Sequence, residues 1–419
     1  MNRKLRLLFL LLALMLTGSS FASTLYYVVD DIRYAANTVD NTAQVVSYGS
    51  YKSMTEINIP ASITADGVSY KVTSLGDSCF KGCTSLTSVK IPASVTALGD
   101  SCFNDCTSLE SITIPASVTK LGWCCFKGCT GLTSITIPNS VTWLGWYCFE
   151  GCTSLTSVNI GNSVTELGDG CFSGCTGLES LTIPNSVTEL GGWCFENCSS
   201  LTSITIPNSV TELPSVCFYG CTSLTSITIP NSVTELGNSC FYGCTSLASV
   251  NIPSSVTSLG GRCFENCASL TSITIPNSVT ELGKACFGGC TSLTRVYCLG
   301  TTPPSCNDYY TFENKASKTL YVPEESVDAY KSAMVWKDFG KIRPINTTGI
   351  KAVDMDKIDI AVEDGTIKLS NVPTNEPVSV YSTSGELLGS GKGNITVSAL
   401  SGQTIIVKVG TRSRKVLVK

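Results

Sequence analysis

One unit of 23 residues repeats ten times along this chain, with no insertion or deletion between copies. Each copy carries two cysteines four residues apart, in the pattern C-F-x-x-C. The first cysteines of the ten copies are Cys79, Cys102, Cys125, Cys148, Cys171, Cys194, Cys217, Cys240, Cys263 and Cys286. A repeat of constant length predicts a solenoid, because every copy must build one coil that packs only against its neighbours. The chain can therefore fold as a stack of coils instead of around one compact core.

Each unit contains the pattern of one strand. Residues 133–137 (T-S-I-T-I) alternate polar and apolar side chains, which is typical of a strand with one buried face. Pro138 then ends the strand, because proline has no N–H to donate to a ladder. Val141 and Leu144 resume the apolar pattern at a tighter spacing, which predicts a turn and a short helical or 3-10 return segment.

Stacked coils of this kind pair their strands in parallel at about 4.8 Å per step. The expected fold is a β-rich solenoid with one parallel β-sheet and short return segments. Because an open stack exposes its core at both ends, caps are expected at residues 23–56 and 299–345, around a solenoid at 57–298. An insertion in the first coil, residues 66–70, is expected to form a hairpin.

The repeat resembles the BspA-like leucine-rich repeat, whose motif runs L-x-x-I-x-I-P-x-x-V-x-x-L-G-x-x-A/C-F-x-x-C. Residues 132–152 and nine related copies along the chain carry this motif, and the resemblance covers about residues 55–345. It implies a right-handed superhelix and a surface protein that binds host matrix proteins, other bacteria or surface glycans.

The N-terminus has the pattern of a secretion signal. Three basic residues precede the apolar run 7–16, and Ser20-Phe21-Ala22 supplies small residues suited to a signal peptidase. We therefore expect a signal peptide at residues 1–22 and no transmembrane segment in the mature chain, since the apolar run is too short to span a bilayer stably. A retained N-terminal anchor is the alternative.

Residues 350–419 differ in character, with short alternating strands between Gly/Ser turns that predict a small all-β sandwich. The segments 378–385 and 415–419 resemble the C-terminal sorting domain of the type IX secretion system. That resemblance implies export by this secretion machinery to the outer-membrane exterior of a Gram-negative, Bacteroidetes-type bacterium. A plain Ig-like stalk is the alternative.

Residues at the same position of successive repeats form a column along the stack. The two cysteine columns allow three interpretations. Cysteine packs as a small buried hydrophobe, and secretion would also permit disulfides, whereas zinc would need side chains that converge from several coils. We favour a structural ladder of thiols without metal, and a disulfide between Cys298 and Cys306 stays open. The first eight members of the ladder are Cys79, Cys83, Cys102, Cys106, Cys125, Cys129, Cys148 and Cys152.

Aromatic residues interrupt columns that hold small or polar residues in other coils, so these positions are expected to be exposed. Exposed tryptophans suit protein hot spots or sugar stacking. Packing against the flank of the solenoid is the alternative. The candidate binding residues are Trp123, Trp143, Trp146, Tyr147 and Trp193.

Several activities are disfavoured by composition. The chain has no histidine and a formal net charge of -4, so a His-based catalytic triad and a nucleic-acid footprint are not expected. A column of glutamates (Glu166, Glu189, Glu212, Glu235 and Glu281) is interpreted as a solvated rim. We expect no enzyme, cofactor or metal ion, but a secreted surface protein for adhesion or for protein or glycan interaction. A passive surface coat and, less favoured, a glycan-acting enzyme are the alternatives.

Overall fold

The computed structural model describes residues 24–345, 358–363, 366–372, 377–382, 387–398, 404–409 and 412–417. The expected signal peptide at 1–22 lies outside these residues, as do residues 346–357. Contacts divide the chain into two units, Met1–Pro344 and Ile345–Lys419, and each is described by itself below.

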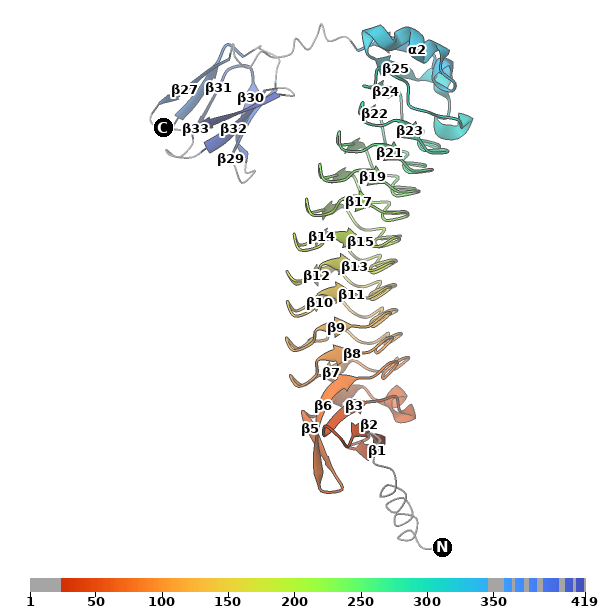
Figure 1. Cartoon of the computed structure of the whole chain (residues 1–419), viewed down its shortest axis with the longest axis vertical. Helices are drawn as coiled ribbons and strands as arrows, with labels where there is room; N and C mark the ends of the chain where they lie inside the picture. Colours follow the sequence, from red (N-terminus) through yellow and green to blue (C-terminus); the bar gives the residue numbers. More distant parts are fainter. Residues whose placement is uncertain are drawn as a thin grey trace, which may run out of the picture. The chain divides into compact units, whose positions relative to one another are not determined.

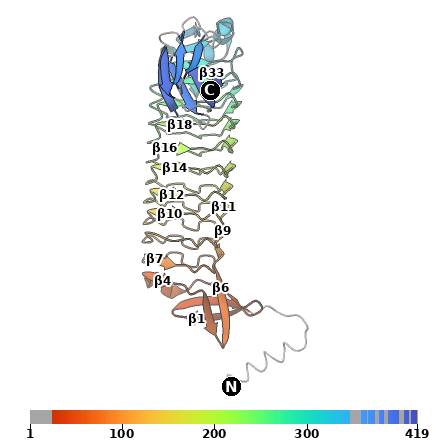
Figure 2. The ribbon, with the colours of Figure 1, turned by 90° about the vertical axis from the view of Figure 1, so that its left-hand side faces the viewer.

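The first unit is a stack of coils with two separate ladders of short strands along it (Figures 1 and 2). The first ladder is the predicted one, in which residues 23 apart pair in parallel, as Ser134 does with Ser157. Its strands are β4 (Glu56–Asn58), β7 (Ser88–Lys90), β10 (Ser134–Thr136), β12 (Ser157–Asn159), β14 (Ser180–Thr182), β16 (Ser203–Thr205), β18 (Ser226–Thr228), β20 (Ser249–Asn251) and β22 (Ser272–Ile275).

The second ladder was not predicted. It forms where a helical or 3-10 return segment was expected, so the solenoid has two parallel ladders and not one sheet. Its N–H groups find partners in the coil before, as Gly168 N donates to Leu144 O at 3.0 Å, and so the segment stays extended. Its strands are β8 (Ala97–Leu98), β9 (Lys120–Leu121), β11 (Trp143–Leu144), β13 (Glu166–Leu167), β15 (Glu189–Leu190), β17 (Glu212–Leu213), β19 (Glu235–Leu236), β21 (Ser258–Leu259) and β23 (Glu281–Leu282).

The C-F-x-x-C segment between the ladders consists of turns that are also tied to the next coil. Phe126 N donates to Cys148 O at 2.8 Å, and equivalent bonds recur along the stack. The phenylalanine rings stack on one another inside the solenoid, with centroids 5.4 Å apart between Phe126 and Phe149. The cysteine, phenylalanine, leucine and valine columns are buried throughout and form one continuous core.

The N-terminal end of the stack is covered by strands. An antiparallel meander of β1 (Thr24–Val29), β2 (Ile32–Asn37) and β3 (Thr42–Val45) pairs through β3 with β6 (Val68–Leu75), which leads into the second ladder. A short 3-10 helix, η1 (Gly49–Ser53), follows β3. The predicted hairpin is confirmed, because β5 (Ser62–Ala65) pairs with β6 around the turn 66–67.

The C-terminal end is closed by an irregular coil and one short helix. Trp336 is buried there, and its Nε1 donates to Pro304 O at 3.0 Å, so this aromatic packs the interior of the cap. Phe312 extends the phenylalanine stack by one more ring. The elements are β24 (Arg295–Cys298), η2 (Tyr309–Thr311), η3 (Lys315–Ser317), β25 (Thr319–Val322), η4 (Glu324–Ser326), α2 (Val327–Ser332), η5 (Trp336–Asp338) and β26 (Lys341–Pro344).

The second unit contains two antiparallel sheets that share one core, which agrees with the predicted all-β sandwich. Ile367 and Leu369 of one sheet lie in the same buried cluster as Val380 and Val407 of the other. One sheet has the order β27 (Asp359–Glu363), β28 (Thr366–Ser370), β31 (Ile395–Ser398). The other has the order β30 (Leu387–Lys392), β29 (Pro377–Ser382), β32 (Thr404–Val409), β33 (Arg412–Leu417).

Candidate binding surface

Two of the candidate tryptophans form a stacked pair on the outside of the solenoid. Trp123 and Trp146 occupy the same column in successive coils, with ring centroids 5.0 Å apart and an interplanar angle of 11°. The exposed fractions of Trp123 and Trp146 are 47% and 44%, so about half of each residue is covered by protein and the rest faces solvent. Contiguous exposed apolar area is a feature of interaction sites on protein surfaces.

Glycines of the next coil make room for the aromatic rings. A Cβ atom on Gly168 would lie 2.7 Å from Cδ1 of Trp146, and one on Gly170 would collide with the ring of Tyr147. Lys127 Nζ lies 5.7 Å from the centroid of the Tyr147 ring, within cation–π range. Trp146 and Tyr147 are therefore seated on small residues and are not loosely extended into solvent.

The structure does not bring all five candidates together. Trp143 is half-buried on β11, three residues before Trp146 and opposite Glu166 of the next coil. Trp193 is 42% exposed but lies two coils beyond Tyr147, with Gly170 at the intervening position of their shared column. The patch is therefore centred on Trp123, Trp146 and Tyr147. We use the name aromatic patch for these three residues together with Trp143.

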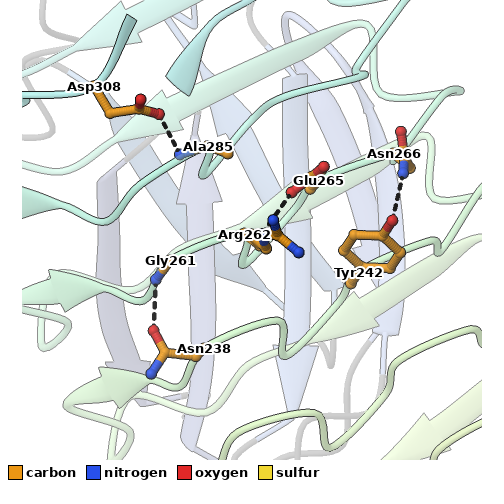
Figure 3. Close-up of polar contacts among 8 residues, drawn as sticks. All are labelled: Asn238, Tyr242, Gly261, Arg262, Glu265, Asn266, Ala285 and Asp308. Atoms are coloured by element: carbon orange, nitrogen blue, oxygen red, sulfur yellow. Dashed lines mark hydrogen bonds and ion pairs between the residues drawn. The ribbon is translucent and has the colours of Figure 1, made fainter. Parts of the chain in front are cut away.

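The column that holds the stacked pair has another role in other coils. There an Asp or Asn side chain accepts a hydrogen bond from the backbone N–H one coil along, as Asp169 Oδ1 does from Gly192 at 2.8 Å. Figure 3 shows a further contact of this type, Asn238 with Gly261 at 2.7 Å. An indole ring offers no such acceptor, so Trp123 and Trp146 take positions where another residue would strengthen the stack.

The glutamate column lies on the second ladder, as expected for a solvated rim. Glu189, Glu212, Glu235 and Glu281 are exposed, and Glu166 is half-buried. Pairing in the ladder is in register, so Glu166 stands directly beside Glu189. No ion pair reaches these glutamates within the part of the chain that the structure describes.

A break in the second ladder opens a groove beside these glutamates. Pro214 replaces the glycine that follows the buried leucine in other coils, and β15 and β17 are not paired. The groove has a volume of about 440 Å³ and is lined by Asp169, Thr188, Glu189, Leu190, Gly191, Gly192, Thr211, Glu212 and Pro214. We did not predict this groove, although the change from E-L-G to E-L-P is visible in the sequence.

All 23 cysteines are free thiols in the structure, and the members of the two cysteine columns are buried. The second cysteine of a coil donates to the carbonyl of the preceding coil, as Cys129 Sγ does to Phe103 O at 3.1 Å. Burial raises the pKa of Cys152 to about 12, so its thiolate is strongly disfavoured. The disulfide left open between Cys298 and Cys306 is not formed, because Cys298 Sγ instead accepts from the Tyr330 hydroxyl at 3.1 Å.

Neither metal ligation nor a membrane-spanning helix is found in the described residues. No group of three or more Cys, Asp or Glu side chains converges there in a way that could hold a metal ion. No helix among the described elements is long and apolar enough to cross a membrane.

Comparison with known proteins identifies the repeat. The family described as "BspA type Leucine rich repeat region" matches residues 47–179, 165–294 and 211–333, so the chain belongs to this family. Proteins of this family are typically cell-surface or secreted proteins, which is compatible with an interaction role at the cell surface. No curated protein sequence matches the chain.

Solved structures are similar over most of the solenoid. A leucine rich cell surface protein from Faecalibacterium prausnitzii is 27% identical and covers 78% of this chain and 96% of its own, with a TM-score of 0.45. A leucine-rich repeat protein from Bacteroides ovatus is also 27% identical, covering 76% of this chain and 100% of its own, with a TM-score of 0.42. The pneumococcal vaccine antigen PcpA shares the fold at 16% identity and a TM-score of 0.50, covering 78% of this chain and 100% of its own.

Proposed function

We propose that this protein is secreted, is displayed on the cell surface and binds a partner there through the aromatic patch. The observation that carries the proposal is the exposed Trp123–Trp146 stack. Its two residues occupy a column where Asp and Asn elsewhere tie one coil to the next. Stability of the stack does not call for tryptophan at these positions, and a binding role gives a reason for it.

A binding screen tests this proposal. The mature protein is presented to host matrix proteins, to surface proteins of other bacteria and to glycan arrays. Trp123→Asn and Trp146→Asn, introduced together, should abolish a hit. Asparagine is the residue this column uses at Asn238, so the variant should keep the fold. Tyr310→Ala removes an aromatic residue that is 69% exposed in the C-terminal cap and should leave binding unchanged.

Three outcomes would count against the proposal. Unchanged affinity of the double tryptophan variant would remove the aromatic patch as the site. A protein that binds nothing in the screen would favour the passive coat. Turnover of a polysaccharide that is lost on changing one glutamate would instead support the glycan-acting enzyme.

We further propose that the C-terminal sandwich is a sorting domain of the type IX secretion system, in a Gram-negative, Bacteroidetes-type bacterium. The support is the resemblance of residues 378–385 and 415–419, of which 383–385 and 418–419 lie outside the described residues. Deleting residues 350–419 should trap the protein in the periplasm. Normal surface display of this truncation would contradict the assignment and would favour a plain stalk.

A further inference from the structure

The glutamates of the second ladder form a row of like charges that the fold itself does not neutralise. Glu166 pairs in register with Glu189, and Glu212 with Glu235, in strands that lie about 4.8 Å apart. Like charges directly opposite one another destabilise a sheet. Other coils have serine or alanine at this position, as at Ser258 and Ala97. The fold therefore does not require glutamate there.

Charge is segregated along the whole middle of the solenoid. Between Lys127 and Arg262 the sequence contains no lysine, arginine or histidine. The same stretch contains eight carboxylates, which leaves 28 basic and 24 acidic residues in the rest of the chain. The eight are Glu150, Glu166, Asp169, Glu179, Glu189, Glu196, Glu212 and Glu235. Of these only Glu150 has a basic partner among the described residues, Lys127 at 2.7 Å.

The groove at Pro214 lies within this acidic row. Glu189 and Glu212 both line it, together with Asp169 and the hydroxyl-bearing Thr188 and Thr211. In a regular coil, the glycine at this position donates its N–H to the preceding coil, as Gly191 N does to Leu167 O at 2.7 Å. Pro214 has no N–H and cannot make this bond, which explains why the groove opens here. A groove with carboxylates on its walls favours cations over neutral or anionic ligands.

The acidic row is continuous with the aromatic patch. Trp143 occupies the glutamate column one coil before Glu166 and pairs with it in the ladder. Trp146 follows three residues later in the same coil. Cations that bind carboxylates also bind over indole rings, and an arginine or lysine stem packs on apolar area.

We propose that the acidic row and the aromatic patch form one docking surface for a lysine- or arginine-rich segment of a partner protein. This proposal rests on the proposed binding function and names the class of its partner. Charge complementarity favours such a segment, since the row has no internal counter-charge. A neutral glycan is less suited for two reasons. Trp123 and Trp146 each turn one ring face toward the other, which leaves less ring area for a sugar to stack on. A neutral sugar also has no charge to pair with the carboxylates of the acidic row.

The test uses the full mature protein and short peptides as probes. The row from Glu166 to Glu235 spans three coil steps, about 14 Å, which a hexapeptide covers. Hexalysine and hexaarginine should bind, while hexaglutamate and hexaserine should not, as measured by calorimetry. Affinity should fall steeply as NaCl is raised from about 50 mM to about 500 mM.

Matched variants separate the row from charge in general. Glu189→Gln with Glu212→Gln should weaken hexaarginine binding by about tenfold. Glu179→Gln removes an exposed charge beside the first ladder and should change affinity by less than about twofold. Equal weakening by both variants, or binding that is insensitive to salt, would overturn the proposal.

The experiment also distinguishes this proposal from the binding function on which it rests. Binding of a glycan or of a non-basic protein that depends on Trp123 and Trp146, with no binding of basic peptides, would refute the basic partner and keep the binding function. Binding of basic peptides that is indifferent to the tryptophans and to Glu189 and Glu212 would refute the docking surface.

Discussion

The Cys106 thiol donates a hydrogen bond to the Phe80 carbonyl oxygen of the preceding coil, with 3.1 Å between sulfur and oxygen. The same bond joins Cys221 to Phe195 and seven further pairs along the solenoid. From Cys106 to Cys290, the second cysteine of a coil is therefore both a small core residue and a donor that links two coils. Alanine could fill much of the same space but could not donate.

This relationship predicts different effects for the two cysteines of one coil. Cys221→Ala removes packing and the bond to Phe195, and should lower the free energy of unfolding by about 2 kcal/mol. Cys217→Ala removes buried volume without a thiol–carbonyl bond and should cost about 1 kcal/mol. Urea unfolding monitored by circular dichroism measures both. A loss for Cys217→Ala equal to that for Cys221→Ala would show that the thiol bond contributes nothing.

The buried thiols predict a loss of stability at high pH. Burial raises the pKa of Cys198 and Cys244 from an ordinary value of 9.0 to about 12. The folded state therefore retains these protons at a pH where the unfolded chain releases them, so stability is complete below pH 9 and falls as pH rises toward 12. Urea midpoints at pH 8 and pH 11 test this. A variant with both cysteines changed to alanine should show a smaller fall, and an identical fall would contradict the assignment.

Close backbone approach between coils predicts that one glycine column tolerates no side chain. A Cβ atom on Gly237 would lie 2.5 Å from Ser215 N and close to further backbone atoms. Gly237→Ala should therefore lower the free energy of unfolding by about 2 kcal/mol or more, because backbone has to move. Gly49→Ala is the matched control, since nothing lies within 4 Å of its Cβ position. Similar stability of the two variants would contradict the predicted clash.

The break at Pro214 predicts the place where the solenoid opens most easily. Trp193 N lies 3.2 Å from Ser215 O across the break, whereas Tyr147 N lies 2.7 Å from Asp169 O in a regular coil. The amide of Trp193 should therefore exchange its hydrogen faster than that of Tyr147. Pro214→Gly restores an N–H at this point and should slow exchange at Trp193. Equal protection of the two amides in the natural protein would show that the break does not weaken the stack.

Much of the fold could be predicted from single repeats. The alternation in residues 133–137 identified the first ladder, and the spacing of 23 identified the coil and its register. The hairpin around residues 66–67 was also visible, because Asp-Gly is a strong turn signal. These features are local, so a pattern of a few residues is enough to indicate them.

The second ladder could not be predicted in the same way. A strand of two residues, such as β13, has no alternation of its own, and its hydrogen-bond partners lie 23 residues away. The charge segregation between Lys127 and Arg262 was visible in the sequence, but its meaning depends on which residues share a face. Glu166 and Glu189 become neighbours only through the pairing of the ladder.

The repeat sequence by itself determined the coil, its length and its buried columns, because burial of leucine, phenylalanine and cysteine at fixed spacing is satisfied by one stacked arrangement. Only the tertiary structure decided what each coil offers its neighbours. The thiol bond from Cys106 to Phe80, the stacking of Trp123 on Trp146 and the break at Pro214 all depend on distances between coils. Such distances are set by the packing of the whole stack, and no single repeat encodes them.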